Sequence, residues 1–313
     1  MEATLASIVA AASPLVYAVV GETLAEKAGV INLSLDGSIM LSAMAGFAAA
    51  YATGSLLLGV LVAAAVSMVV ALLIAFASIE LRLNQIAVGF VLTMLCTDLS
   101  SFLGDPYVGQ RLSGVPHLAI PGLSSIPWLG PIFFDHNLSV YGSFLAIAAA
   151  YFFIFRTRRG LELQGVGERP EAAHARGLRV NRLRYLYTVL GGALVGLAGA
   201  AYSLDVRLGW RDGLTTNYGW IALAIVIFGG WHPVRAASGC YLFGALSIVA
   251  LKLQPRLPDL TQILSFTPFV LMIFALLLVS QDWSRRLAAR YPRWRRLLSG
   301  DPPTAMGLAF WRD

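Results

Sequence analysis

The chain has 313 residues, of which 58% are hydrophobic and only 13% are charged, and its mean hydropathy is +0.71. A soluble protein needs a charged, water-facing surface, so this composition excludes an ordinary soluble fold and indicates a protein of the lipid bilayer. The formal net charge of +6 would suggest nucleic-acid binding in a soluble protein. In a membrane protein, however, the position of the basic residues along the chain is more informative than their sum.

Apolar stretches long enough to cross a bilayer follow one another along the chain. A hydrocarbon core of about 30 Å needs roughly 20 apolar residues per helix. Barrel strands would alternate in segments of about ten residues, whereas the stretch from Leu56 to Ala77 is apolar on every face. The first stretch has no basic residues before it, so we expect a retained span and not a cleaved signal peptide. The predicted fold is all-α and polytopic, with about nine transmembrane helices at residues 4–20, 35–52, 55–79, 86–103, 138–155, 185–204, 218–230, 236–253 and 262–280.

The connection between the first two predicted spans places polar residues where lipid would surround them. Asn32, Ser34 and Asp36 stand among apolar residues and near glycines. An unpaired carboxylate is costly at membrane depth, and an interrupted helix is tolerated there only where the chain lines a cavity. We therefore predict a discontinuous helix, and we place these three residues on a substrate pathway together with Asn84 and Thr93. The alternative is an ordinary N-cap at a membrane face, with Asn32 or Ser34 as the capping residue.

Asp98, in the fourth predicted span, is the most isolated acid of the apolar segments. A proton relay would use such a carboxylate. A position near the external end of the span, where the carboxylate is hydrogen-bonded or hydrated, explains it more simply. The following connection, residues 104–137, is rich in proline and glycine, which predicts an irregular external cap or a short re-entrant turn.

Basic residues gather in two segments, the connection at residues 156–184 and the tail at residues 281–313. Cytoplasmic loops retain Lys and Arg, so both segments are expected inside the cell. Alternation then places 18 of the 23 basic residues inside and 5 outside, with the N-terminus outside and the C-terminus in the cytoplasm. The membrane domain is thus residues 1–280. Trp and Tyr between the arginines of the tail favour an anchor to anionic membrane lipid, and we expect no nucleic-acid partner.

The connection at 156–184 contains the signals of a short helix. Pro170 suits a first helical position, and Gly177 suits the position after a helix end. Glu171 in the first turn and Arg176 in the last match the helix dipole. Small residues let another backbone approach closely, and they occupy positions Ala172, Ala173 and Ala175. The pattern favours a docking helix over the alternative, a solvated basic linker.

A second unit of span, polar glycine-containing break and short span occurs near Asp205 to Trp220. Alternation places this break on the opposite side of the membrane from the break near Gly21 to Met40, as an inverted repeat would. The match is topological, with little residue identity. The external side of this second break, with the 104–137 loop, is our candidate surface for an external protein, with docking residues Arg207, Trp210, Arg211 and Asp212.

The basic connection resembles the coupling region of type II ABC importer permeases. The resemblance rests on Gly165-Val166-Gly167-Glu168, Glu171-Ala172-Ala173 and Gly177, followed by Tyr185 and a span with Gly191-Gly192, Gly196 and Gly199. In that family the short helix seats in a cleft of the ATP-hydrolysing subunit. The resemblance implies that the coupling contacts here are Glu168, Glu171, Ala172, Ala173 and Gly177.

Two further stretches resemble the nucleoside and simple-sugar branch of the same family. One is the pattern Glu-x-x-Gly-Val-x-Asn-x-x-x-acid-Gly, which here begins at Glu26 and has Asp36 where the branch usually has Glu. The other is the C-terminal half, with residues 218–224, 228–233, 242–245 and 267–269. The resemblance covers nearly the whole chain, and it implies an importer permease of the plasma (inner) membrane for a nucleoside or a simple sugar.

The chain carries no phosphate-binding loop, because its nearest approach, residues 21–27, has Glu26 where a glycine is needed. The resemblance implies that ATP and Mg are bound by a partner ATPase. The other implied partners are a second, related permease, which would form a heterodimer, and an external solute-binding protein or lipoprotein. We expect no cofactor on this chain, no metal site, and buried roles for Cys96 and Cys240.

Two other functions compete with this interpretation. One is a secondary transporter in which Asp36 and Asp98 couple transport to protons or sodium. The other is an integral-membrane enzyme, which is disfavoured because no pair of acids, Ser/His pair or metal cluster converges at one membrane face. We therefore predict no catalytic residues.

Overall fold

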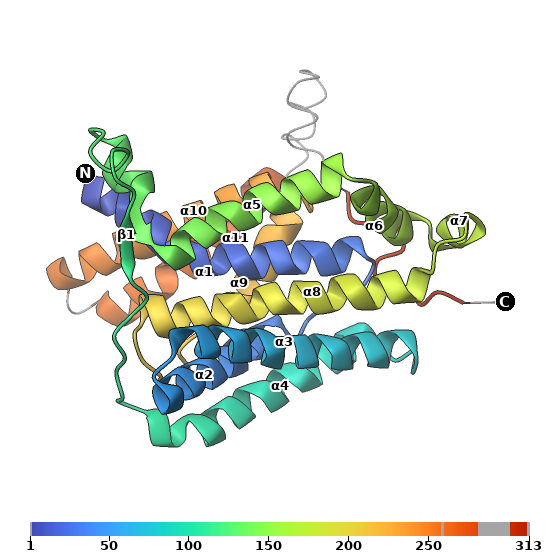
Figure 1. Ribbon diagram of the computed structural model, residues 1–313, viewed down its shortest axis with the longest axis horizontal. Helices are drawn as coiled ribbons and strands as arrows, with labels where there is room; N and C mark the ends of the chain where they lie inside the picture. The colour runs from blue at the N-terminus through green and yellow to red at the C-terminus, as the bar shows by residue number, and fades with distance from the viewer. Residues whose placement is uncertain (1, 258–259, 281–300, 312–313) are drawn as a thin grey trace.

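The computed structural model describes residues 2–257, 260–280 and 301–311 (Figure 1). These residues are predominantly helical, which confirms the all-α prediction. The helices are α1 (Glu2–Lys27), α2 (Leu35–Thr53), α3 (Leu56–Ile79), α4 (Gln85–Gly104), α5 (Leu138–Arg156), α6 (Arg158–Glu168), α7 (Pro170–Ala175), α8 (Val180–Ala201), α9 (Tyr218–Phe228), α10 (Pro233–Leu253) and α11 (Thr261–Ser280). Short turns of helix extend or join them at η1 (Asp105–Tyr107), η2 (Gly130–Phe134), η3 (Tyr202–Val206) and η4 (Gln254–Arg256).

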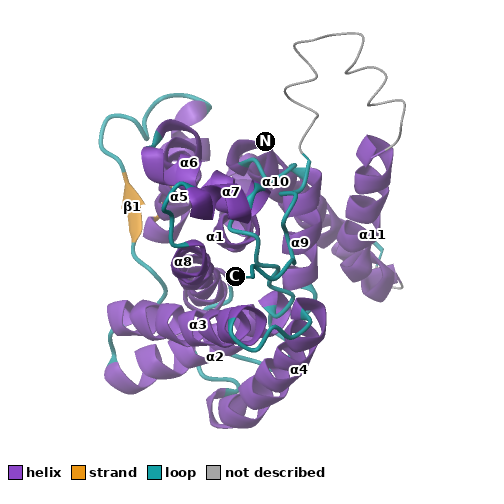
Figure 2. Ribbon diagram, turned by 90° about the vertical axis from the view of Figure 1, so that its right-hand side faces the viewer, coloured by secondary structure: helices purple, strands orange, loops and turns teal. Residues whose placement is uncertain are grey.

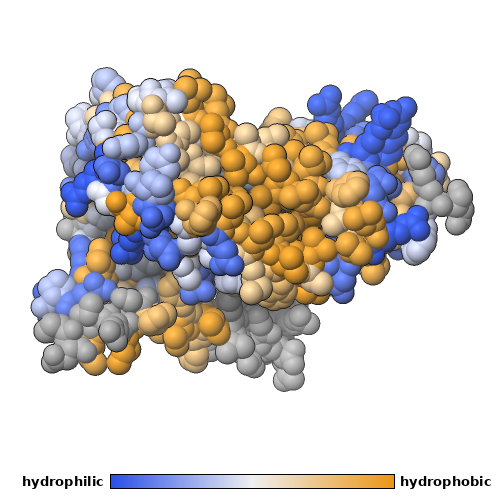
Figure 3. All heavy atoms as spheres, turned by 90° about the horizontal axis from the view of Figure 1, so that it is seen from below, coloured by the Kyte–Doolittle hydropathy of each residue, from blue (hydrophilic) through white to orange (hydrophobic). Residues whose placement is uncertain are grey.

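Each predicted span falls on one of the helices α1 to α5 and α8 to α11. Within the described ranges, seven helices are long and apolar enough to cross a membrane, and α9 is a shorter apolar helix. Figure 3 shows an apolar band across the middle of the molecule, with hydrophilic residues gathered at both ends. The polytopic membrane fold is therefore confirmed.

The centre of the bundle is the pair α1 and α8, which lie side by side (Figures 1 and 2). They touch at Gly21 and Gly191, where a Cβ added to either glycine would collide with the carbonyl oxygen of the other. Small residues permit this close approach of two helices in lipid. One apolar core is formed mainly by side chains of α1, α8, α9 and α10, and a second mainly by side chains of α2, α3 and α4. Helix α8 also packs on α3, and α1 also packs on α10. Whether the two halves form an inverted repeat stays a prediction.

Two breaks interrupt the central helices, at residues 28–34 before α2 and at residues 207–217 before α9. The sequence predicts a first span that ends near residue 20, whereas α1 continues to Lys27. The prediction of this end is wrong because the polar groups of the extra two turns find partners inside the bundle. Thr23 Oγ1 donates to Val19 O over 2.7 Å, and Glu26 accepts from a tryptophan of the second half.

The connection at residues 104–137 is irregular, as predicted, and forms a cap at one end of the molecule (Figure 1). Its only regular pairing within the described residues is a two-stranded antiparallel ladder of β1 (His117–Ala119) and β2 (Asp135–Asn137). The register pairs His117 with Asn137 and Ala119 with Asp135. The cap leads directly into α5.

The connection after α5 forms α6 and α7 at the opposite end of the bundle (Figure 1). The predicted short helix is present as α7, and it closes with Gly177 at φ +86°, where Leu178 N donates to Ala173 O over 3.1 Å. This left-handed closure requires glycine or costs energy. The helix α6 was not predicted. Its 11 residues include glycines of low helix propensity, but Leu163 and Val166 are fully buried and fix it against the bundle.

Candidate functional site

The first helix break is a buried polar site rather than a loose loop. Glu22 is 0% exposed, and its Oε1 accepts from Asn32 N over 3.1 Å. The side-chain oxygen of Asn32 in turn accepts from the backbone N and from the hydroxyl of Ser34, over 3.1 and 2.7 Å. Helix α4 closes the site, because Gln85 accepts from Ile31 N over 2.8 Å. Non-helical backbone is tolerated at this depth because its donors are paired within the protein.

Asp36 joins the two halves of the chain. It lies in the first turn of α2, is 8% exposed, and accepts hydrogen bonds from Gly219 N over 2.8 Å and Asn217 N over 3.3 Å. Both donors belong to the N-terminal end of α9, where Asn217 itself provides no side-chain cap. The positive ends of the α2 and α9 dipoles therefore meet at one carboxylate, which accepts hydrogen bonds from the start of α9. A Cβ at Gly219 would collide with the backbone of Asp36, so this junction requires glycine.

The other end of α9 is held by a second acid from the same stretch. Glu26 is 3% exposed, and its Oε2 accepts from the indole Nε1 of Trp231 over 2.5 Å. Trp231 follows the C-terminal end of α9 and adopts φ +53°. Glu26 and Asp36 thus bind the two ends of one short helix. The sequence pattern that contains them is explained by contacts with a helix far along the chain.

The predicted pathway residues are only partly brought together. Asn32 and Ser34 lie in the first break, Asp36 lies just after it in α2, and Thr93 reaches the break by donating from Oγ1 to Leu33 O over 2.8 Å. Asn84 is exposed and, among the described residues, makes no bond to the break; it caps α4 by accepting from the backbone of that helix. Ser34 occupies the N-cap position of α2 without a capping bond from its side chain. The placement of these residues on a substrate pathway stays a prediction.

A cavity of about 330 Å³ lies beside the second break, and no motif of the sequence indicates it. Its aromatic wall consists of Tyr202, Tyr218, Phe243 and Phe269. Tyr218 is the centre of this wall, because the other three rings each meet it edge to face, at centroid distances of 4.7 to 6.2 Å. Tyr202 is 3% exposed, and its hydroxyl has no partner within the described part of the chain. Arg207, Ser247 and Gln254 add polar groups to the lining.

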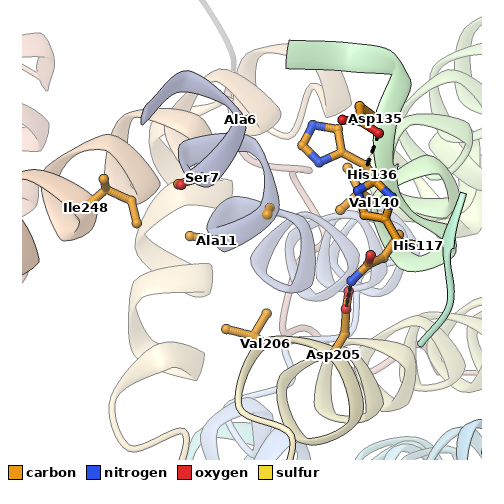
Figure 4. Close-up of a pocket in the computed structure, with 12 residues that line it drawn as sticks. Ala6, Ser7, Ala11, His117, Asp135, His136, Val140, Asp205, Val206 and Ile248 are labelled. Atoms are coloured by element: carbon orange, nitrogen blue, oxygen red, sulfur yellow. Dashed lines mark hydrogen bonds and ion pairs between the residues drawn. The ribbon is translucent and has the colours of Figure 1, made fainter. Parts of the chain in front are cut away.

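A second cavity, of about 430 Å³, lies at the cap formed by residues 104–137 (Figure 4). Alanines and Ser7 of α1 form one wall, and His117, Asp135 and His136 of the cap form another. Asp205 closes it, and its carboxylate accepts from the side chains of Asn137 and Ser139. His117 Nε2 lies 3.6 Å from Asp135 Oδ1. These polar groups pair with one another, so they fix the cap to η3 and the start of α5.

The predicted external docking residues differ in their exposure. Arg207, Arg211 and Asp212 are exposed, and Asp212 accepts from Ser101 Oγ over 2.5 Å. Trp210 is only 3% exposed and packs against Gly104 at the end of α4. It therefore cannot contact a partner in this conformation, and its role here is to pack the second break against α4.

The predicted coupling residues also fall into two groups. Glu171, Ala172 and Gly177 are exposed at the surface of α7 and its closing turn. Ala173 is 5% exposed and faces inward, and Glu168 accepts hydrogen bonds from the C-terminal segment of the same chain. Glu168 is exposed as well, so Ala173 is the one predicted coupling residue that does not lie at the surface.

The turn between α9 and α10 carries a titratable group close to this end of the molecule. Burial, together with the charges of Arg235 and Lys27, lowers the pKa of His232 below its ordinary value. Its ring stacks on Phe155 at a centroid distance of 4.9 Å. The neutral ring is therefore the form that fits this site.

No group of three or more His, Cys, Asp or Glu side chains within the described ranges could hold a metal ion. Cys96 and Cys240 are free thiols, 3% and 0% exposed, as expected for buried small residues. Asp98 is exposed on α4 and has no hydrogen-bond or ion-pair partner among the residues that the structure describes.

Comparison with known proteins agrees with this architecture. A family model described as "Branched-chain amino acid transport system / permease component" matches residues 4–276. "Putative glucose ABC transporter permease protein TsgC13" of Haloferax volcanii is 39% identical over 250 residues, 79% of this chain and 76% of that protein. A guanosine ABC transporter permease of Bacillus subtilis is 32% identical, over 85% of this chain and 88% of its own. A nucleoside ABC transporter permease of Lactococcus lactis is 30% identical, over 89% and 92%. No solved structure matches the chain.

Proposed function

Because this chain belongs to the branched-chain amino acid transport system permease family and is the permease subunit of an ABC importer, we propose that it carries a nucleoside into the cell. A simple sugar is the competing solute. Relatives named for guanosine and for nucleosides support the first, and the relative from Haloferax volcanii named for glucose supports the second. The family match gives no support to an ion-coupled secondary transporter that uses Asp36 and Asp98.

The aromatic cavity beside the second break is the observation that carries the choice of a nucleoside. Transporter sites lie near helix breaks at the interface of structural repeats. Ligand pockets are typically about 300–1,000 Å³, mostly apolar, with a few polar groups, and the 330 Å³ cavity has this composition. Rings such as Tyr218 and Phe269 would stack on a base, while the Tyr202 hydroxyl and the polar lining would bond the ribose or base edges. A hexose offers less surface for stacking.

The choice of solute is testable with the reconstituted importer. We expect unlabelled guanosine, but not glucose, to compete with uptake of a labelled nucleoside. Base stacking on an aromatic ring contributes about 1–3 kcal/mol, so Phe269→Ala is expected to lower uptake at least about fivefold. Phe266→Ala is the matched control on the same helix, because Phe266 is 62% exposed and does not line the cavity. Uptake of glucose alone, or equal effects of the two variants, would reject the proposal.

The outer face of α7 is the proposed contact with a partner ATPase that binds ATP and Mg. Its support is the exposure of Glu171 and Ala172 at one end of the bundle, on a helix anchored by the burial of Pro170 and Ala173. A docking surface must be exposed yet firmly held, and α7 meets both conditions. The contact transmits the movements of the ATPase to the permease.

Replacement of Ala172 by Trp tests this contact. We expect the external binding protein to keep its affinity for the solute while ATP-driven uptake is lost. Ala119→Trp, on the exposed hairpin at the other end of the molecule, is the control. Normal uptake by Ala172→Trp would exclude α7 as the coupling surface.

The proposed orientation places α7 and the C-terminus in the cytoplasm and the N-terminus outside, as the distribution of arginines favours. A cysteine at position 172 should react with a membrane-impermeant thiol reagent only in inside-out vesicles. The two native thiols are buried and give little background. Labelling from the outside would reverse the orientation and remove the coupling proposal with it.

The exposed face of α4 is the proposed contact with a second permease. Large apolar side chains lie uncovered along it, among them Phe90, Met94 and Phe102 at 48, 68 and 80% exposure. Asp98 is exposed in the same helix, and a carboxylate facing lipid is costly. A second permease with a hydrated path between the chains would accommodate both. Bacillus subtilis and Lactococcus lactis each have a second permease that matches part of this chain, which supports a heterodimer.

An external binding protein is the remaining proposed partner, and its proposed contacts are the exposed residues Arg207, Arg211 and Asp212.

A further inference from the structure

The C-terminal segment at residues 301–311, here called the C-terminal strap, crosses the end of the molecule that carries α6 and α7 (Figures 1 and 2). It has no helix or strand, yet Pro303, Ala305 and Phe310 are buried. Segments at chain ends are usually poorly ordered unless specific contacts hold them. The contacts of the strap therefore indicate a role.

One set of contacts joins the strap to α6 and α7. Ala305 N donates to Gly167 O over 2.9 Å. Thr304 donates to Glu168 Oε2 twice, from its backbone N over 3.2 Å and from its hydroxyl over 2.8 Å. Phe310 is 8% exposed, and it packs against Val166 of α6, Ala173 of α7 and Val180 at the start of α8. The strap thus contacts the inner face of α7.

A second set of contacts joins the strap to the first helix break. Gly307 N donates to Gly29 O over 3.0 Å, and Gly307 lies against Ile31. Leu308 O accepts from Arg184 Nη1 over 2.8 Å. Arg184 is 2% exposed, and its other nitrogens have no partner in the described part of the chain. An unpaired buried guanidinium is costly, so the carbonyl of the strap is important for this site.

The geometry points to a positioning role, and we propose that the strap links α7 to the first helix break, so that a push or pull on α7 reaches the site that holds Asp36. The strap covers Ala173 but leaves Glu171 and Ala172 exposed, so it supports the docking surface from behind and does not block it. The proposal rests on the proposed function of α7. It assigns to Thr304 and Phe310 a task in coupling, without contact to solute or ATP.

The test is uptake per ATP hydrolysed by the reconstituted importer, measured for Phe310→Ala against Leu308→Ala. Leu308 is the matched control, because its side chain is 61% exposed and only its backbone carbonyl contacts Arg184. Coupling between sites typically corresponds to factors of about 5 to 150, so we expect at least a fivefold fall in the ratio for Phe310→Ala. The ATPase should still co-purify and hydrolyse ATP within about twofold of the native rate, and Leu308→Ala should behave as native.

Three outcomes would overturn the proposal. Unchanged uptake per ATP hydrolysed in Phe310→Ala would leave the strap with a packing role only, and an increased ratio would make it an inhibitor. Loss of the ATPase from the complex would make the strap an assembly element. If Phe310→Ala does not fold, Thr304→Val decides, with an expected fall of about twofold to fivefold for one lost hydrogen bond. Ala172→Trp distinguishes failure of this proposal from failure of the proposed role of α7. Normal uptake by Ala172→Trp would exclude α7 as the coupling surface. Lost uptake by Ala172→Trp, with an unchanged ratio in Phe310→Ala, would exclude only the role of the strap.

Discussion

Removal of the Asp36 carboxylate is the sharpest test of how the two halves of this permease are joined. In Asp36→Ala, Gly219 N loses its acceptor in a buried site, which costs about 1–3 kcal/mol. The second bond, from the partly buried Asn217 N, contributes less, and the charge at the start of α9 adds about 0.3–1 kcal/mol. We therefore expect the free energy of unfolding to fall by roughly 2–4 kcal/mol.

The measurement can use the native cysteines as reporters of unfolding. Cys96 and Cys240 are buried in different parts of the bundle, so a thiol-reactive dye labels them only as the protein opens. Asp98→Ala is the control, because that carboxylate is exposed on the apolar helix α4 and unpaired within the described residues, so its removal should not lower the free energy of unfolding. Asp36→Asn keeps one acceptor oxygen and should fall between the two. Equal stability of Asp36→Ala and Asp98→Ala would refute the role assigned to this carboxylate.

Three further predictions concern single positions. Gly191→Val should lower the free energy of unfolding by about 1–3 kcal/mol or more, because its Cβ would collide with a backbone carbonyl of α1. Gly165→Ala has open space around it and should raise the free energy of unfolding by about 0.5–1 kcal/mol in the same dye assay. Gly177 has φ +86°, so Gly177→Ala should lower the free energy of unfolding by about 1–2 kcal/mol and should also lower uptake per ATP hydrolysed. Uptake at the native level would show that the function of α7 does not depend on this glycine closure. Burial and neighbouring cations lower the pKa of His232, so the unfolded chain takes up that proton first and stability is lost as the pH falls below about 6.5. His232→Phe should therefore lose less stability between pH 7 and pH 5 than the native chain does, and equal losses would assign the titration to another group.

The fold was largely predictable because its signals are local. Continuous apolar stretches identify the long helices, and Pro170 with Gly177 identifies α7. The end of α1 and the helix α6 were not predictable in this way. Both depend on partners elsewhere in the bundle, since Glu26 in the last turn of α1 bonds a residue 205 positions away. From the sequence alone, a carboxylate within an apolar stretch predicts the end of a span, because its buried partner is not visible in the sequence.

The sequence identified several residues of the candidate site, but it did not identify their contacts. The sequence singled out Asn32, Ser34 and Asp36 as polar groups that need partners, and the structure supplies those partners within the chain. The aromatic cavity could not be predicted, because Tyr202, Tyr218 and Phe269 converge only when η3, α9 and α11 are placed together. Aromatic residues in separate apolar spans give no sign of which rings will meet.

The contacts of α9 connect the first helix break to the cavity. Asp36 binds the N-terminal end of this helix and Glu26 binds the turn after it, so an 11-residue helix, about 16 Å long, is held at both ends by acids that flank the first break. Tyr218, the first residue of α9, is also the central ring of the aromatic wall. Since Gly219 and Asp36 touch through their backbones, α9 cannot slide along α2 without breaking a buried hydrogen bond. A motion that widens the cavity at Tyr218 must therefore either separate Asp36 from α9 or carry the start of α2 with it.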